Sequence, residues 1–514
     1  MTAGTPLSSP NSTSTTTTTT PTTTPDSTAV TEQHSPALGV LMPGFVGTTL
    51  PDWLAELLRH GLGGVCLFAH NIVSPAQVAA LTGAIRAANP NAIVAIDEEG
   101  GDVTRLHQHH GSPFPGNAVL GRIDDLDVTV AVAREVGAQL ADVGIHLTFA
   151  PDADVNSNPD NPVIGVRSFG ADPASVAAHT AAWTSGVQAA GVAACAKHFP
   201  GHGDTSTDSH VSEPVVTADA ATIMNRELVP FVAAVGAGTR SIMTSHIRVP
   251  ALDPDSVATF STTILTDLLR ARLGFDGVIV TDALDMVGAS GTRGIPAAAV
   301  EAVAAGADLL CLGQRGSEGE VAEIAEALMS ADRAGRLPAG RLVAAAERCL
   351  GLAQWAAEHR PVDRSHTTAT YERLTDPQRL AASFTLSERA RSSLAADTRP
   401  IRWVRIDPEL NVAVGVTPLG PFFDGGAVPS LVVPVDDRAV AAEYVAEPGV
   451  TTLVVGREFH RDPGALDAAM AIVERSEALI VDMGYAHSDH VDIATFGASR
   501  RIGEALLRLV EESA

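Results

Sequence analysis

The chain has 514 residues, of which 45% are hydrophobic and 18% are charged, and its formal net charge at pH 7 is −26. This length suffices for two or three domains of roughly 100–250 residues, and the composition excludes a wholly disordered or collagen-like chain. The negative charge argues against a broad basic surface for nucleic-acid phosphates or anionic lipid. We therefore expect neither nucleic acid nor a membrane as a partner.

Residues 1–33 consist mostly of Thr, Ser and Pro, a composition that predicts a disordered tail. This segment lacks the basic start and apolar core of a signal peptide, and no later stretch holds about 20 uninterrupted apolar residues. The four cysteines stand singly in apolar stretches, which favours buried small side chains over disulfides or zinc ligands. These features predict a soluble, cytoplasmic protein.

From residue 38 onward, short apolar runs alternate with longer segments of helical periodicity, as in repeated βα units around a parallel sheet. Eight such runs favour a closed (β/α)8 TIM-like barrel over residues 34–360. A doubly wound open sheet is the competing architecture, and periodicity does not separate the two. The strand candidates are Leu38–Met42, Gly64–Phe68, Ala92–Ile96, His146–Ala150, Val192–Ala196, Ser241–Thr244, Val278–Thr281 and Asp308–Leu312.

Beyond the barrel, residues 361–395 are interpreted as a linker and a helix. The segment Glu358–Arg373 is polar and irregular, and a helix is expected over Asp376–Ala395. Residues 396–514 are interpreted as a smaller C-terminal α/β domain without a phosphate-binding glycine loop, and their sequence discloses no function. The strand candidates in it are Ile401–Ile406, Val412–Val416, Ser430–Val433, Thr451–Val455 and Ala478–Asp482.

Charged residues follow several strand candidates, at the end where barrels and open sheets both bind ligands. The third run is followed by Asp97 in the sequence DEEGG, and Arg105 returns toward the same rim. This ending suits a ligand loop, although a capped turn explains any one acid alone. The long, turn-rich segment 156–170 holds one cation, Arg167, which either serves a ligand or pairs with a neighbouring carboxylate.

The densest polar segment is residues 197–210, KHFPGHGDTSTDSH, which begins where the fifth apolar run ends. A metal site could use its histidines together with Asp204 or Asp208. Acid/base chemistry could use His210, with Asp208 orienting and charging the imidazole. On these residues alone the two interpretations are level. The polar residues of the segment are Lys197, His198, His202, Asp204, Asp208 and His210.

A further carboxylate, Asp282, directly follows the seventh apolar run in the sequence GVIVTDALDM (277–286). A carboxylate at the exit of a barrel strand is a candidate nucleophile, able to attack an electrophilic carbon and later leave. The alternative is a cap of the following turn, which is the better explanation for Asp285.

The motifs KHFPGHGDTSTDSH and GVIVTDALDM together resemble glycoside hydrolase family 3, in its β-N-acetylglucosaminidase branch. The stretches IDEEGGDVTRL (96–106) and NPDNPVIGVRSFG (158–170) occur in the matching order, and the likeness covers residues 37–360. Two positions depart from the family pattern. Ala283 stands where many relatives have a second Asp, and Asp102 replaces a commonly basic residue; either change could alter the pocket, but neither removes a catalytic group.

The resemblance implies a retaining double displacement in which Asp282 attacks the anomeric carbon, His210 is the acid/base and Asp208 is its partner. It further implies that the hydroxyls and N-acetyl group of the terminal sugar are bound by Asp97, Arg105, Arg167, Lys197 and His198. No metal or other cofactor is implied. The expected substrate is a small saccharide with terminal N-acetylglucosamine, such as a cell-wall or chitin fragment.

Two other activities stay open at this point. A histidine acid/base does not repel phosphate as a carboxylate would, so inorganic phosphate could replace water as the acceptor and make the protein a phosphorylase. A barrel that binds amino sugars without turnover is the alternative of another class, and the intact Asp282, Asp208 and His210 argue against it.

Overall fold

The computed structural model describes Met1, residues 35–207, 213–291, 293–359, 365–395, 399–409, 411, 413–486 and 488–512. The predicted tail and the pair Asp208 and His210 thus lie outside the described residues. Contacts between Cα atoms group residues 35–514 into one compact unit. Among the described helices, none is both long and apolar enough to span a bilayer.

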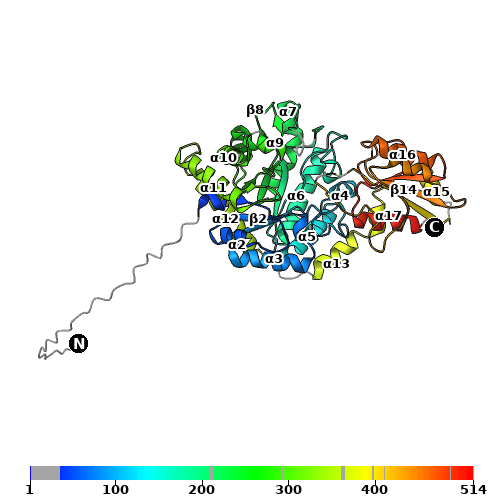
Figure 1. Cartoon of the computed structure of the whole chain (residues 1–514), viewed down its shortest axis with the longest axis horizontal. Coiled ribbons are helices and arrows are strands. Elements are labelled where there is room, and N and C mark those ends of the chain that lie inside the picture. The colour runs from blue at the N-terminus through cyan, green and yellow to red at the C-terminus, as the bar shows by residue number, and fades with distance from the viewer. Residues whose placement is uncertain are drawn as a thin grey trace. The chain divides into compact units, whose positions relative to one another are not determined.

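Eight parallel strands of the described chain form a barrel (Figure 1). Six of them pair in the order β2-β3-β4-β5-β6-β9. Three further links close the ring. The Val280–Leu309 bridge joins β9 to the segment of β10, and β10 pairs with β1. The Cys66 N–H donates to the Pro43 carbonyl at 3.0 Å, which joins β1 to β2. The ring is therefore closed, as predicted, and the open sheet is excluded. Its strands are β1 (Leu41–Met42), β2 (Gly64–Leu67), β3 (Ile93–Ile96), β4 (Leu147–Thr148), β5 (Ala193–Phe199), β6 (Ser241–Thr244), β9 (Val278–Val280) and β10 (Leu310–Cys311).

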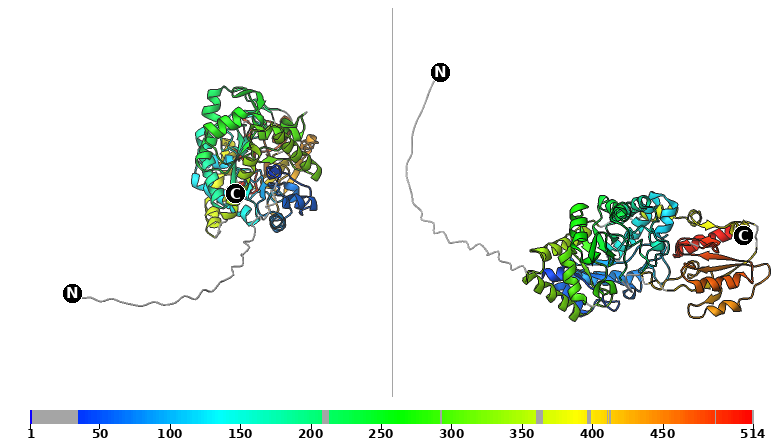
Figure 2. Two further views of the ribbon diagram at one scale, coloured as in Figure 1. Left: turned by 90° about the vertical axis from the view of Figure 1, so that its left-hand side faces the viewer. Right: turned by 90° about the horizontal axis from the view of Figure 1, so that it is seen from above.

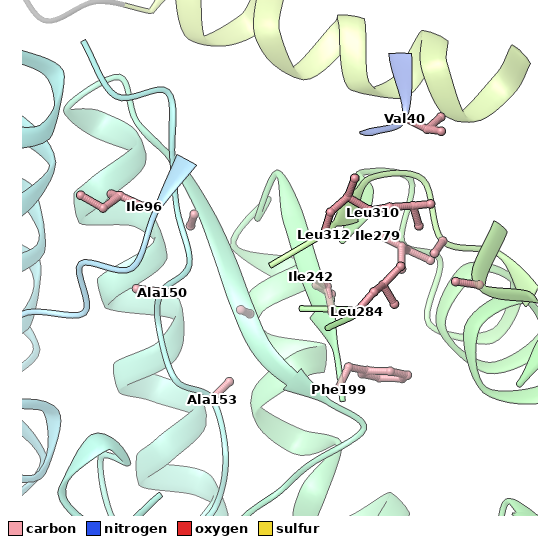
Figure 3. Packing of buried hydrophobic residues seen from close by; sticks show 14 of the residues in the cluster. Val40, Ile96, Ala150, Ala153, Phe199, Ile242, Ile279, Leu284, Leu310 and Leu312 are labelled. Atoms are coloured by element: carbon pink, nitrogen blue, oxygen red, sulfur yellow. The ribbon is translucent and has the colours of Figure 1, made fainter. Parts of the chain in front are cut away.

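Alternation along the strands divides the apolar side chains into an inner and an outer layer. Met42, Cys66 and Cys195 belong to the inner cluster, whereas their strand neighbours join the outer cluster under the helices. Figure 3 shows the outer layer, with Ile242 and Ile279 of adjacent strands side by side. All four cysteines are free and buried, so the prediction of buried small side chains is confirmed.

Helices connect successive strands and cover the outside of the barrel (Figure 1). Several begin at side-chain caps: the Ser74 hydroxyl accepts the Gln77 N–H, and Asp172 accepts that of Ser175. The longer ones are α2 (Asp52–Arg59), α3 (Pro75–Ala88), α5 (Leu126–Asp142), α6 (Pro173–Ala189), α8 (Val229–Gly236), α10 (Ile295–Ala305), α11 (Glu318–Arg333) and α12 (Arg341–Glu358), together with the π-helices η3 (Ile223–Glu227) and η5 (Thr263–Arg272).

The C-terminal region forms a second sheet with helices on both faces (Figure 2). Leu453 and Val455 pack in one cluster with α17 (Arg500–Glu512), while Val454 packs with α16 (Pro463–Val473) on the other face. The strand order is β11 (Thr385–Leu386), β16 (Ile493–Ala494), β15 (Ala478–Asp482), β14 (Thr451–Gly456), β12 (Ile401–Ile406) and β13 (Pro429–Val433), all parallel except the β11–β16 pair. This is the predicted smaller α/β domain.

The segment before this sheet differs from the sequence-based expectation. Residues Ser365–Leu374 form helix α13, where an irregular link is predicted, and the single helix expected over Asp376–Ala395 is wrong. That segment splits into α14 (Pro377–Ala381), β11 and α15 (Glu388–Ala395). The interruption has a distant cause, because β11 pairs with β16 near the end of the chain.

The strand expected over Val412–Val416 is also wrong for its described residues, 413–416, which form a turn. The Asn411 carboxamide oxygen accepts the N–H groups of Ala413 and Val414, and Gly415 has a φ of +72°. An Asn side chain that bonds its own following backbone stabilises a turn in place of a strand ladder.

Candidate active site

The carboxyl ends of the barrel strands surround a cavity of about 120 Å³. Asp97 follows β3, Lys197 and His198 lie near the end of β5, and Asp282 follows β9. Parallel strands deliver their carboxyl ends to one end of a barrel, so these side chains meet. The cavity is lined by every predicted site residue that the structure describes, namely Asp97, Arg105, Arg167, Lys197, His198 and Asp282.

Charged side chains of both signs line this cavity, and among Asp97, Glu99, Arg167 and Lys197 all but the half-buried Asp97 are buried. The Lys197 ammonium lies 2.8 Å from a carboxylate oxygen of Asp97 and 2.8 Å from one of Glu99. The Arg167 guanidinium donates to both oxygens of Glu99, with Nη2 at 2.7 Å and Nε at 3.1 Å. Two acids and two bases thus hold one another in a fixed geometry.

The network keeps its acids ionised. Burial alone would raise the pKa of Asp97, but the charges of Lys197 and Arg105 outweigh burial and lower that pKa well below its usual range. The pKa of Glu99 is lowered in the same way by Arg167 and Lys197, and the pKa values of these two cations are raised. The cavity therefore presents full charges of both signs to a ligand at neutral pH.

Arg105 connects the cavity to the C-terminal region. Its Nη2 lies 3.7 Å from Asp97 and donates to the Ala413 carbonyl at 2.8 Å, while Nη1 donates to the Val414 carbonyl at 3.4 Å. Ala413 itself lines the cavity. The C-terminal region thus reaches the mouth of the barrel, which its sequence gave no reason to expect.

His198 is oriented by a buried carboxylate on the neighbouring loop. Its Nδ1 lies 2.7 Å from Asp154, which also accepts the backbone N–H groups of His198 and His202. Burial raises the pKa of Asp154, but the charge and hydrogen bond of His198 outweigh burial and lower it. The other ring nitrogen of His198, Nε2, faces the Arg167 Nη2 at 3.4 Å.

Close packing shapes the loop that follows Lys197. A side chain at Gly203 would place its Cβ 1.8 Å from the Val155 carbonyl oxygen, so glycine is required there. The Asn161 amide donates to the His202 carbonyl at 2.9 Å, and the His202 ring bonds the Thr205 hydroxyl at 2.7 Å. Burial lowers the pKa of His202 to about 4, so this ring is neutral at pH 7.

The metal site that the sequence left open finds a poor donor set in the described residues. Asp204 pairs with Arg226 at 2.6 Å. One group of three, Asp152, Asp154 and His198, brings potential ligand atoms within 4.8 Å of one another. The Arg167 guanidinium lies 3.6 Å from Asp152 and 3.4 Å from the His198 Nε2, and this fixed positive charge disfavours a cation there.

Asp282 faces the same cavity from β9, and its Oδ1 accepts the N–H of Ala283 at 2.8 Å. Asp285, interpreted above as a cap, lines the cavity instead and accepts the Gln314 N–H at 3.3 Å, so the cap assignment is wrong. The following helix, α9 (Val287–Ser290), has no side-chain cap.

Sequence reasoning did not select Glu99, which pairs with Lys197 and Arg167. It also missed two buried acids of the next strand exit, Asp152 and Asp154, which support Arg167 and His198. The signal was present, because the fourth apolar run ends at Ala150 and is followed by the sequence PDAD. Asp102 was named as a departure that could alter the pocket, but it does not line the cavity. It pairs with Arg457 of the C-terminal region at 3.0 Å.

Comparison with known proteins places these features in a family. Residues 48–352 match the family described as Glycosyl hydrolase family 3 N terminal domain. The Beta-hexosaminidase A of Pseudoalteromonas piscicida is 42% identical over 285 residues, which cover 51% of this chain and 48% of that protein. The chain thus matches about half the length of that relative. The Beta-hexosaminidase of Nitrosomonas eutropha is 38% identical over 283 residues, which cover 54% of this chain and 80% of that protein.

A solved structure of the same family matches almost the whole chain. It is a glycoside hydrolase family 3 beta-N-acetylglucosaminidase from Paenibacillus sp. str. FPU-7, with a TM-score of 0.82 and 29% sequence identity. The match covers 94% of this chain and 97% of that one, so the barrel and the C-terminal sheet are both included.

Proposed function

The chain belongs to glycoside hydrolase family 3, and from this premise we propose that it is a retaining exo-β-N-acetylglucosaminidase that removes terminal N-acetylglucosamine from small saccharides. Family membership makes the protein a glycoside hydrolase. The substrate is inferred from the names of the relatives and from the groups at the mouth of the barrel.

One observation carries the proposal: the six described site residues line a single cavity and present paired charges of opposite sign. A sugar hydroxyl both donates and accepts a hydrogen bond. Asp97 can accept from a hydroxyl while Lys197 or Arg105 donates to it, so adjacent hydroxyls of one ring suit this arrangement. The preformed ion pairs hold these groups in position before the sugar arrives.

In the proposed reaction, an oxygen of the Asp282 carboxylate forms a bond to the anomeric carbon. The bond between that carbon and the leaving oxygen breaks, and the leaving oxygen takes a proton from His210, for which Asp208 is the proposed partner. In the second step His210 removes a proton from water. The water oxygen then bonds to the anomeric carbon, and Asp282 leaves as a carboxylate with retention of configuration.

The test is turnover of p-nitrophenyl β-N-acetylglucosaminide with and without phosphate, with identification of the sugar product. We expect free N-acetylglucosamine with retained configuration, no stimulation by phosphate and no loss of rate with a chelator. A sugar 1-phosphate formed faster would identify a phosphorylase. Absence of turnover in both conditions would contradict the roles of Asp282 and His210 and favour a sugar-binding protein. The cytoplasmic location stays a prediction of the sequence.

A further inference from the structure

We propose that the ion pair between Arg226 and Asp204 positions the acid/base, because it fixes the start of the segment that leads to Asp208 and His210. This inference rests on the proposed function, in which His210 transfers the proton. It adds two positioning residues that lie outside the cavity, since neither Arg226 nor Asp204 lines it.

Asp204 stands between the sugar-binding end of β5 and the acid/base in the sequence. It follows His198 by six positions, and it precedes Asp208 by four and His210 by six. Its carboxylate accepts a hydrogen bond from the Arg226 Nη2 at 2.6 Å. The two side chains are 28% and 27% exposed, so salt screens this pair less than a pair on an open surface. The contact therefore ties the described start of the segment to helix η3.

Arg226 is itself held from the other side. Its Nε donates to the Glu227 carboxylate at 2.5 Å, and Glu227 is fully buried. One guanidinium thus joins an acid of the helix to Asp204 of the loop, and its planar donor groups fix the two directions relative to each other. A single ammonium group would not impose this geometry, so arginine suits the position.

Helix η3 contacts the same loop at a second point. A Cβ at Gly201 would lie 2.7 Å from the Glu227 Cβ, so the loop backbone packs directly on this helix. In η3 the Leu228 N–H donates to the Ile223 carbonyl at 3.0 Å, five residues back. Such π-helical turns are rare and occur frequently at functional sites. Here the turn carries Arg226 and Glu227, and both side chains meet the loop.

The far end of the segment has an anchor of the same kind. Glu213 accepts a hydrogen bond from the Arg248 Nε at 2.7 Å. In the sequence, Asp208 and His210 lie between the two anchors and outside the described residues. A general acid acts only within hydrogen-bond reach of the leaving oxygen, so the fixed ends of this segment bear on the rate of proton transfer.

The role of the ion pair is tested by changing the leaving group. A 2,4-dinitrophenolate leaves without a proton, whereas the sugar released from diacetylchitobiose needs one. The measured quantity is kcat/KM for 2,4-dinitrophenyl β-N-acetylglucosaminide and for diacetylchitobiose, because kcat/KM reports the steps up to formation of the glycosyl-enzyme. The ratio of the two values does not depend on the fraction of folded enzyme, so a loss of stability alone leaves it unchanged.

Asp204→Asn should lower kcat/KM for diacetylchitobiose about tenfold and leave the dinitrophenyl glycoside within about twofold, since a displaced acid loses part of its roughly 10²–10⁴-fold contribution. Arg226→Met should show the same split because it loses the same contact, and His210→Gln a larger one. The matched control is Arg333→Met, since Arg333 pairs with Glu326 of α11 at the same 2.6 Å and does not line the cavity. It should leave both values unchanged.

The outcomes separate this assignment from the proposed function. An unchanged or inverted ratio in either Asp204→Asn or Arg226→Met, or a split in Arg333→Met, overturns the assignment. The proposed function then stands as long as His210→Gln shows the split. If His210→Gln leaves the ratio unchanged, or the unmodified enzyme cleaves neither substrate, the proposed function fails first and the assignment fails with it.

Discussion

The barrel and the C-terminal sheet both place charged side chains at the carboxyl ends of parallel strands, but they pair these charges differently. In the barrel, Lys197 and Arg167 are held by acids of the barrel itself, and the cavity between them is about 120 Å³. At the second sheet, Arg457 reaches across to Asp102 of the barrel, and the cavity is about 590 Å³ with an aromatic wall.

Charge pairs within the barrel and a charge pair between the two regions have different consequences. A small cavity with internally paired charges is preorganised around one ring and suits the stabilisation of a charged transition state. The larger cavity instead lies where a charged contact, Arg457 with Asp102, joins the C-terminal sheet to the barrel. We therefore expect changes at the barrel mouth to affect every substrate, and changes at the second edge to affect the joint between the two regions.

The largest effect is expected at the proposed nucleophile. Asp282→Asn removes the attacking carboxylate, so kcat/KM should fall by at least about 10³-fold on all substrates. The control is Asp276→Asn, an exposed acid at the other end of the same strand, which should keep full activity. Activity assays on purified variants of equal thermal stability measure this effect, and comparable rates for the two variants would remove Asp282 from the mechanism.

The strands of the barrel could be predicted from the sequence, whereas parts of the C-terminal region could not. All eight barrel strands were predicted, because each is a short apolar run buried on both faces. The positions of Asp97 and Asp282 at strand exits could be predicted for the same reason. The break after α14 could not, because a distant partner decides it: β11 pairs with β16. The turn at Ala413 was missed for another reason, since its causes, Asn411 and Gly415, are local but the apolar run 412–416 favoured a strand.

The pairing of charges was equally hard to predict. Arg457 is one of many arginines in an α/β pattern, and nothing near it in the sequence indicates Asp102 as its partner. Asp102 was identified as a departure from the family pattern, and the structure gives that departure a cause outside the sugar pocket. Local motifs thus predict which residues stand at strand ends, while contacts between the two regions require the fold.

The second-largest effect is expected at Lys197, which forms ion pairs with Asp97 and Glu99 at the barrel cavity. Lys197 is the only lysine in the chain, and Lys197→Met leaves the buried Glu99 and the half-buried Asp97 with less compensating charge. We expect a loss of about 3–5 kcal/mol in the free energy of unfolding at pH 7.

The pH dependence of this loss has a definite sign. The pKa values of Asp97 and Glu99 are lowered in the folded protein, so their stabilisation is present above the pKa of the unfolded chain and is lost as pH falls. The deficit of Lys197→Met should therefore stay near its full size from pH 7 to about pH 4.5 and shrink as pH falls from there toward pH 2 in urea titrations. Exposed Arg272→Met is the control, and a deficit independent of pH would contradict the role of these ion pairs.

A smaller effect is expected at the joint between the regions. Arg457→Met leaves Asp102 buried and unpaired, which should cost about 3 kcal/mol of unfolding free energy. Burial already raises the pKa of Asp102 against the opposing charge of Arg457, so Asp102 can take up a proton in this variant and limit the loss. Adding Asp102→Asn should recover part of the stability in urea titrations, and strictly additive losses would show that the two side chains do not interact.

The smallest effect is expected at Glu227, an acid of the barrel whose pKa is raised, whereas the pKa of Asp97 is lowered. Glu227 on η3 is fully buried, and burial raises its pKa to about 7 although Arg226 lies 2.5 Å away and opposes the shift. A carboxyl with a raised pKa in the folded state contributes its full stability below its unfolded pKa of about 4.5, and loses that contribution as pH rises through 7. Glu227→Gln has no proton to lose, so it should match the parent near pH 4 and exceed it at pH 8 by on the order of 1–3 kcal/mol. If Glu227→Gln and the parent differ in unfolding free energy by the same amount at pH 4 and pH 8, Arg226 keeps Glu227 ionised at both pH values. The pKa of Glu227 would then be lowered, as the pKa values of Asp97 and Glu99 are.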